Sequence, residues 1–412
     1  MKKNNKVGLV VMVMILIILA GLGGWTLGRA SLYSSNVKED GEGKIDMNQV
    51  VKNLQTYRIL IDENYLYKYK DNDLENGIYK GYIAGLQDPY SEYFTPEEYQ
   101  SFMDETTGNF EGIGLKVGVE DDNRITVISA FEGSPAAKAG IRTGDKILAV
   151  DGKEYLGEAL GEAAKAMRGK AGTEVAVTYQ RGKGDQAEKK TVTMKREKIE
   201  VDTVRSELLK DKIGYLVIDS FDEGTGRHFA QHLKDLEKKG ANRLILDLRN
   251  NGGGLIDSCE EVADQLLGKG TIVTVVDKKG QKEIAASDPD HDPIPMVVLV
   301  NDGSASASEI LVGALRDNRR ALIIGQKTFG KGIVQKLYPI TVHGKEAGLK
   351  LTMAEYLTPS GDHIHKKGIQ PDIPVALPKG VTKMGTPYLS QDTQLLRAIQ
   401  EVKKVNSEKV NP

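Results

Sequence analysis

Apolar and polar residues follow different periods in different parts of the chain. An uncharged apolar run over residues 7–27 is long enough to cross a bilayer as a helix. Residues 31–45 are polar and contain glycine, a composition typical of a flexible tether. Apolar residues at helical spacing then predict amphipathic helices over residues 47–65, 74–86 and 96–105. The apolar faces of these helices need a partner, which is either the rest of the chain or a second copy of it.

After residue 110 the apolar period changes to two, which indicates β-strands. The small β unit expected there has strands near 112–117, 125–128, 174–180 and 190–195, and a helix over 156–167. From residue 211 onwards strands alternate with helices, which predicts a largely parallel sheet covered by helices. Its expected strands are 213–218, 243–249, 271–276, 296–300 and 321–324, and its expected helices are 226–240, 256–267 and 306–318. A hairpin of strands 332–338 and 349–356 and a last helix over 391–402 follow.

These patterns predict a multidomain α/β chain. Its parts are a transmembrane segment (residues 1–30), a tether with a helical region (31–107), a β domain (108–197), a βα-layered core (198–378) and a helical tail (379–412). Lys2, Lys3 and Lys6 precede the apolar run and should stay in the cytoplasm, which places the remainder of the chain outside. A cleaved signal peptide is the alternative, but no clean Ala-x-Ala site follows the run. We therefore expect an uncleaved single-pass anchor in the cell membrane.

Composition excludes several classes of function. The formal net charge is −2 and no basic patch interleaves with aromatic residues, so nucleic acid is not an expected partner. Cys259 is the only cysteine, which leaves no internal disulfide and no cysteine-rich metal site; we expect it in the core. The six histidines form no His-Glu-x-x-His motif, and His363-x-His365 fits a solvated loop pair better than a chelate. We expect no metal and no cofactor.

Residues 297–311 combine a buried strand, a tight turn and a helix. The apolar run ends at Asn301-Asp302-Gly303, and the helix begins in a cluster of serine and alanine. A hydroxyl at such a corner lies near free N–H groups and the positive end of the helix dipole, which suits a nucleophile whose product is an oxyanion. Ser306-x-x-Glu309 is, however, also a well-formed capping box, in which the serine only terminates a helix.

Two other motifs bear on this choice. Gly252-Gly253-Gly254 follows a predicted strand, and its N–H groups suit an oxyanion hole or merely a tight turn; the spacing is not that of a phosphate-binding loop. Lys331 lies between glycines at the start of an apolar strand. Burial would lower the pKa of this lysine and make it a general base, whereas a solvated turn lysine would have no such role. Gln335, four residues further along the strand, would share its face and hold the amine.

The series Gly-Ser-Pro-Ala-Ala, Ala-Gly-Ile, Gly-Asp and Val-Asp-Gly over residues 133–152 resembles a PDZ domain. Gly112-Ile113-Gly114-Leu115 resembles the carboxylate-binding loop of that domain. Successive N–H groups of such a loop form an anion cradle, and an exposed strand edge accepts an extended peptide. The apolar pocket for the last side chain of the peptide would be lined by Leu115, Val117 and Met167.

Taken together, the motifs resemble those of the C-terminal processing peptidases, or tail-specific proteases, which are serine peptidases with a Ser–Lys dyad. The resemblance covers nearly the whole chain and rests on residues 86–93, 247–254, 301–310, 328–335, 358–361 and 368–372. Residues 362–365 depart from the usual pattern without touching a catalytic position. The resemblance implies a protease core of the crotonase/Clp-like kind. Its implied roles are Ser306 as nucleophile, Lys331 as base, Gln335 as the residue that orients the base, and N–H groups of Gly252 or Gly253 and of Ala307 as the oxyanion hole.

The resemblance also implies a function, namely cleavage of proteins near a free C-terminus that the PDZ domain holds. A homodimer is a further implication. Arg168 is a candidate link between ligand occupancy and the protease core, although a solvated arginine at a helix end is the alternative. Two other functions remain open, a catalytically inert PDZ adaptor tethered to the membrane and an acyl-CoA enzyme of the crotonase kind.

Overall fold

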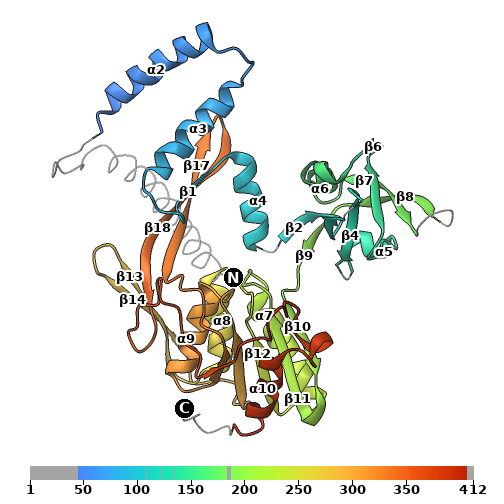
Figure 1. Ribbon diagram of the computed structural model, residues 1–412, viewed down its shortest axis with the longest axis vertical. Coiled ribbons are helices and arrows are strands. Elements are labelled where there is room, and N and C mark those ends of the chain that lie inside the picture. Colours follow the sequence, from blue (N-terminus) through green and yellow to red (C-terminus); the bar gives the residue numbers. More distant parts are fainter. Residues whose placement is uncertain (1–44, 108, 121, 132, 183–186, 406–412) are drawn as a thin grey trace, which may run out of the picture. The chain divides into compact units, whose positions relative to one another are not determined.

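The computed structural model describes residues 45–107, 109–120, 122–131, 133–182 and 187–405 (Figure 1). The expected anchor over residues 1–30 and nearly all of the tether lie outside these ranges. Within them, no helix is both long enough and apolar enough to cross a membrane. The chain divides into two compact units, residues 1–71 and 72–412.

The described part of the first unit is mainly the helix α2 (Met47–Asn64), which confirms the helix expected over 47–65. The side chain of Asp46 caps its first turn by accepting the N–H groups of Asn48 and Gln49. Helix α2 buries none of its residues, and its exposed apolar side chains include Tyr57, Ile59 and Leu60.

The second unit begins with α3 (Asp71–Ala84), β1 (Glu92–Phe94) and α4 (Pro96–Thr107). Both helices were expected, although α3 starts three residues earlier than the apolar spacing indicated. Strand β1 was not expected, because three residues are too few to show a period. It pairs antiparallel with β18 (Lys345–Leu357), and Tyr93 and Phe94 are buried there.

The PDZ-like part is a six-stranded antiparallel sheet with the order β3-β4-β5-β7-β8, and β6 pairs with β5. Its elements are β3 (Leu115–Val119), β4 (Ile125–Ala130), α5 (Pro135–Lys138), β5 (Lys146–Val150), β6 (Lys153–Glu154), α6 (Leu160–Met167), β7 (Glu174–Arg181) and β8 (Glu188–Lys195). A separate pair, β2 (Asn109–Gly112) and β9 (Glu197–Glu200), joins its two ends. Strand β3 is at an edge of the sheet, so one side of it is open to an added strand.

The core sheet has six strands in the order β10-β11-β12-β15-β16-β19, and all neighbours are parallel except β10 and β11. The strands are β10 (Val204–Leu208), β11 (Ile213–Ile218), β12 (Arg243–Asp247), β15 (Met296–Val300), β16 (Leu322–Gly325) and β19 (Ile373–Pro374). Apolar residues of one face pack with α7 (Thr225–Lys238), α8 (Ile256–Leu266) and α9 (Ala307–Asp317). Those of the other face pack with α10 (Thr393–Val402). The predicted helix-covered parallel sheet is confirmed.

A second sheet holds the strand that follows Lys331. It comprises β1, β13 (Gly270–Asp277), β14 (Lys282–Ser287), β17 (Ile333–Val342) and β18. The expected hairpin is confirmed as β17–β18. The strand expected at 271–276 was assigned to the parallel sheet, but as β13 it pairs antiparallel with β14 and β18. Local apolar content cannot distinguish the two settings, because the same short apolar run fits a strand of either sheet.

Candidate active site

Three serines lie at the corner between β15 and α9, and their hydroxyl groups differ. Ser304 is buried and donates to the carbonyl oxygen of Leu248 at 2.7 Å. Ser308 is buried and donates to the carbonyl oxygen of Asn251 at 2.9 Å. Ser306 is half-buried; its oxygen takes part in a capping box with the backbone N–H of Glu309, and no described residue accepts its hydroxyl proton. Of the three, only Ser306 therefore has a hydroxyl free for chemistry.

The backbone at Ser306 is unusual. Ser306 is the N-cap of α9 and has φ 57° and ψ −118°, a conformation that is strained for a residue with a side chain. The next residue, Ala307, begins the helix, and its N–H has no partner in the described ranges. The corner therefore presents a free hydroxyl beside a free N–H at the positive end of a helix.

The triple-glycine loop lies against this corner. A Cβ on Gly253 would lie 2.8 Å from Cβ of Ser306 and 2.9 Å from N of Ala307, and its φ of 101° also favours glycine. The N–H of Gly253 already donates to Oδ1 of Asn251 at 2.8 Å. The N–H of Gly252 has no partner among the described residues, and no atom lies within 4 Å of the position a Cβ would take there. Of the two predicted donors in this loop, Gly252 is the one available.

A buried ionic network supports the strand before that loop. The Arg249 guanidinium pairs with Asp247 at 2.6 Å and with Asp392 at 2.9 Å, and all three side chains are at most 5% exposed. Asp392 is the N-cap of α10, where it also accepts the N–H of Leu395. Burial alone would raise the pKa of Asp392, but the hydrogen-bonded Arg249 lowers it below the usual value. The sequence analysis did not foresee this link, because its partners are far apart in the chain.

Lys331 meets the main requirement for a general base. Burial, with a smaller contribution from the charge of Lys350, lowers the pKa of its amine. Nζ lies 5.2 Å from the centre of the Tyr90 ring, and no ion pair to Lys331 occurs in the part of the chain that the structure describes. Burial and the like charge of Lys350 therefore shift the equilibrium toward the neutral amine, which an ordinary solvated lysine would not show.

Glu309 joins the nucleophile segment to the base segment. Its Oε2 accepts the backbone N–H of Ser306 at 3.0 Å and that of Lys331 at 2.8 Å. Its Oε1 accepts the N–H of Gly330 at 2.8 Å and the hydroxyl of Thr328 at 2.5 Å. Glu309 thus acts on the N-cap as a capping-box glutamate does, and it also reaches the base. The capping and catalytic interpretations of this motif do not exclude each other.

The reacting side chains make no direct hydrogen bond in the described part of the chain. Within the described residues no hydrogen bond joins the Ser306 hydroxyl to the Lys331 amine, and such bonds commonly tighten only when substrate binds. The side chain of Gln335 makes none to Lys331 either, and its buried Nε2 has no partner in the same residues. Lys331 lies outside β17, which begins at Ile333. The alternation of a strand therefore does not fix its side chain on the face of Gln335, and the orienting role of Gln335 stays a prediction.

The PDZ-like part presents β3 as an open edge of its sheet. Of the predicted pocket residues, Met167 is buried, and Leu115 and Val117 are partly buried against the same cluster, as is the loop residue Ile113. Gly114 has φ 75°, and a Cβ there would lie 2.3 Å from Cβ of Ser134, so the loop requires glycine. Gly112 is tight as well, because a Cβ on it would lie 3.3 Å from the carbonyl oxygen of Met167. The N–H groups of Ile113 and Gly114 lack partners among the residues described, as a carboxylate cradle requires.

Arg168 is the C-cap of α6, and its Nη1 lies 3.7 Å from Oδ2 of Asp104 on α4. The Arg168 side chain is 40% exposed, and ion pairs at such sites contribute little to stability.

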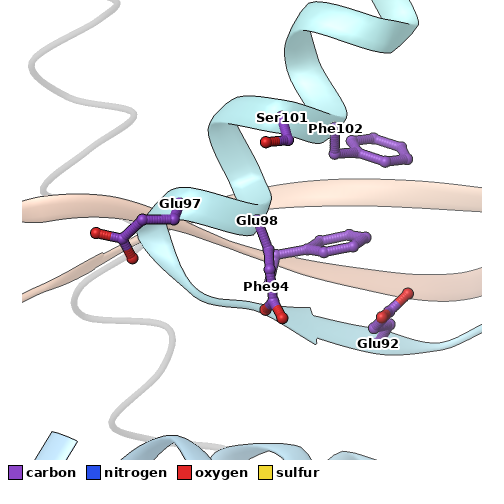
Figure 2. Close-up of a pocket in the computed structure, with 6 residues that line it drawn as sticks. All are labelled: Glu92, Phe94, Glu97, Glu98, Ser101 and Phe102. Carbon is purple, nitrogen blue, oxygen red and sulfur yellow. The ribbon is translucent and has the colours of Figure 1, made fainter. Parts of the chain in front are cut away.

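A shallow pocket of about 360 Å³ lies between β1 and α4 (Figure 2). Its lining residues are Glu92, Phe94, Glu97, Glu98, Ser101 and Phe102. The two phenylalanine rings stack with centres 4.9 Å apart, while Glu92 pairs with Lys350 and Glu98 with Lys80. None of the predicted site residues lines this pocket.

Comparisons with known proteins show the family to which the chain belongs. Residues 212–375 match Peptidase family S41, and residues 126–181 match the PDZ domain. The chain is 40% identical over 350 residues to a probable CtpA-like serine protease of Staphylococcus aureus (strain COL), covering 84% of this chain and 68% of that protein. It is 36% identical over 395 residues to the carboxy-terminal processing protease CtpA of Bacillus subtilis (strain 168), covering 95% of this chain and 81% of that one.

Among solved structures, it is similar to the photosystem II D1 C-terminal processing protease, with 31% identity, coverage of 80% of this chain and 88% of that chain, and a TM-score of 0.46. The protein is a serine-type peptidase that carries a PDZ domain. It belongs to Peptidase family S41, among the carboxy-terminal processing proteases.

Proposed function

We propose that the chain is a membrane-anchored, extracytoplasmic serine endopeptidase that binds free protein C-termini through its PDZ domain and cleaves near them with a Ser306–Lys331 dyad. The observation that carries this proposal is the free hydroxyl of Ser306, beside the free N–H of Ala307 and tied through Glu309 to a lysine of lowered pKa. A nucleophile, a base and an oxyanion donor are thereby present at one corner.

In the proposed reaction the neutral amine of Lys331 takes the hydroxyl proton of Ser306 as Oγ attacks the peptide carbonyl carbon. The N–H groups of Gly252 and Ala307 donate to the resulting oxyanion. Lys331 then gives the proton to the leaving amine, and an acyl-enzyme remains on Ser306. Water, deprotonated by Lys331, attacks the acyl carbon; the bond to Oγ of Ser306 breaks, Lys331 returns the proton to Oγ, and the new C-terminus is released. Gln335 orients the amine through its side-chain carbonyl, and the chain needs no metal or cofactor for these steps.

Substrate selection is assigned to the edge of β3. The N–H groups of Ile113 and Gly114 would hold a terminal carboxylate, and the peptide would add as a strand beside Leu115 and Val117. Arg168 would report occupancy to the protease through α4, where it meets Asp104. Peptide-stimulated activity that is unchanged in Arg168→Ala would remove this gating role.

Location and assembly rest mainly on the sequence. The uncharged run over residues 7–27, preceded by lysines, supports an anchor with residues 31–412 outside the cytoplasm. The exposed apolar residues Tyr57, Ile59 and Leu60 of α2 support a homodimer. Mass spectrometry of the mature N-terminus tests the anchor, because a cleaved signal peptide would give a shortened chain. Sedimentation of the detergent-solubilised chain tests the dimer.

The catalytic proposal is tested with the full chain in detergent and a peptide that ends in apolar residues. Wild-type protein should shorten the peptide, whereas Ser306→Ala and Lys331→Ala should bind it and leave it intact. An inert adaptor would bind the peptide without shortening it in any variant. Cleavage by Ser306→Ala at the wild-type rate would reject the nucleophile, and tight binding of coenzyme A would favour the crotonase-like alternative.

A further inference from the structure

The hydroxyl of Tyr356 lies between the two dyad segments. It is 3.0 Å from the carbonyl oxygen of Ser306 and 2.5 Å from that of Lys331. The backbone N–H of Tyr356 also donates to the carbonyl oxygen of Gly332 at 3.1 Å. Tyr356 is 2% exposed and belongs to β18, so its ring has little freedom to move.

These contacts complement those of Glu309. One carboxylate oxygen of Glu309 accepts the N–H groups of both Ser306 and Lys331, while one phenol oxygen faces the carbonyl groups of the same two residues. Two side-chain atoms therefore contact all four backbone polar groups of the dyad residues, and the carbonyl oxygen of Ser306 also accepts the N–H groups of Glu309 and Ile310. A shift of one dyad segment against the other would disturb contacts on both sides.

We propose that Tyr356 is a positioning residue for the dyad, whose hydroxyl fixes the carbonyl side of Ser306 and Lys331 while Glu309 fixes their N–H side. The proposal rests on the proposed function, since it supposes that Ser306 and Lys331 react together. It adds a residue that touches neither the substrate nor the reacting atoms.

The phenol is suited to this role at the pH where the base works. Burial, together with the negative charge of Glu309 and the nearby Cys259, raises the pKa of Tyr356 well above its usual value. The hydroxyl therefore remains a donor at the alkaline pH that favours the neutral amine of Lys331. Because it has one proton and faces two carbonyl oxygens, it donates to one of them at a time.

The test is Tyr356→Phe, which removes the hydroxyl and keeps the ring. Misplacement of reacting groups by about 1 Å can cost on the order of 100-fold in rate, so we expect kcat to fall by about 10- to 100-fold. KM should change by less than about threefold, because the substrate is held elsewhere. Both constants are measured with the full chain and a peptide that ends in apolar residues, and kcat is normalised to the folded fraction from thermal melts.

Ser287→Ala is the matched control. The Ser287 hydroxyl is also buried and also lies between two backbone carbonyl oxygens, those of Gly268 at 2.7 Å and Gly270 at 3.2 Å. It belongs to β14 and contacts neither dyad residue, so its loss should lower Tm to a similar extent while kcat stays near wild type.

Three outcomes would overturn the inference. The first is a kcat of Tyr356→Phe within about threefold of wild type, and the second is an equal loss of kcat in Ser287→Ala. The third is a Tyr356→Phe chain that shows no cooperative thermal melt, which would assign the hydroxyl to stability alone. Ser306→Ala is measured in parallel to separate the two proposals. If it still cleaves, the proposed function itself fails; if it is inactive and Tyr356→Phe is not impaired, only the positioning role fails.

Discussion

The backbone N–H groups of Ser306 and Lys331 donate to the same atom, Oε2 of Glu309, at 3.0 and 2.8 Å. The two residues come from different elements, the start of α9 and the loop before β17. A shared acceptor sets the separation of their backbones more tightly than packing alone would. Glu309 is fully buried, so water cannot replace it.

Replacement of Glu309 by glutamine should therefore impair catalysis more than its small change in size suggests. The new amide would turn an N–H₂ group toward donors that now face a carboxylate, and a buried donor without an acceptor costs about 1–3 kcal/mol. We expect Glu309→Gln to lose at least about 100-fold in kcat and to unfold at a lower denaturant concentration. Steady-state kinetics and urea titration measure the two effects. Wild-type kcat in this variant would show that the shared acceptor is dispensable.

The rate should depend on pH through Lys331. Burial and the charge of Lys350 lower the pKa of the amine, and only the neutral amine can act as base, so activity should rise with pH through an apparent pKa below about 10.4. Lys350→Met removes the like charge, so the pKa of Lys331 should rise and the rising limb of the pH–rate profile should move to higher pH. Lys336→Met, on the exposed side of β17, is the control and should leave the limb in place. A limb that moves to lower pH in Lys350→Met would contradict the assignment.

Asp392 should stabilise the protein far more than an exposed carboxylate that pairs with the other end of α10. Removing one partner of a buried ion pair costs about 3–5 kcal/mol, so Asp392→Ala should lose this much in free energy of unfolding at pH 7. Asp211→Ala is the control, because Asp211 makes an exposed pair with Lys403 at the end of α10, and such pairs are worth at most about 1 kcal/mol. Equal losses in the two variants would refute the buried network as a source of stability.

The pKa of Asp392 also gives this contribution a pH dependence. Because the folded-state pKa is lowered, the stabilisation is fully present above the unfolded value of about 3.9 and is lost as the pH falls through the folded-state pKa. The difference in unfolding free energy between wild type and Asp392→Ala should therefore shrink in acid. Chemical denaturation at a series of pH values from neutral to about 3 measures it.

Neighbouring glycines of the oxyanion loop should tolerate alanine very differently. Gly253→Ala places a methyl group 2.7 Å from the carbonyl oxygen of Ala305 and 2.8 Å from Cβ of Ser306, so Tm and kcat should both fall sharply. Gly252→Ala meets open space, so its Tm should stay within about 2 °C of wild type. Thermal melts of the two variants provide the comparison, and a more damaging change at Gly252 would argue against the observed loop conformation.

The sequence was sufficient where the signal is local. The apolar run before Asn301, the turn at Gly303 and the helix after Ser306 are set by residues only a few positions apart, and the structure has these elements where they were expected. The βα alternation likewise predicted the helix-covered sheet. Two features were not predicted. Strand β1 has only three residues, and β13 was assigned to the parallel sheet although it belongs to the second sheet.

Tertiary structure alone decided which groups of the candidate site are free. Ser304 and Ser308 each donate a hydroxyl to a carbonyl oxygen of another segment, of Leu248 and of Asn251, whereas Ser306 does not, and this difference could not be read from their shared serine–alanine cluster. In the same way Gly253 is engaged by Asn251 and Gly252 is not. A periodic pattern reflects which face of an element is buried, so it can be seen in the sequence. Hydrogen bonds between distant segments depend on where the folded chain brings them together, so the availability of each donor and nucleophile followed from the fold.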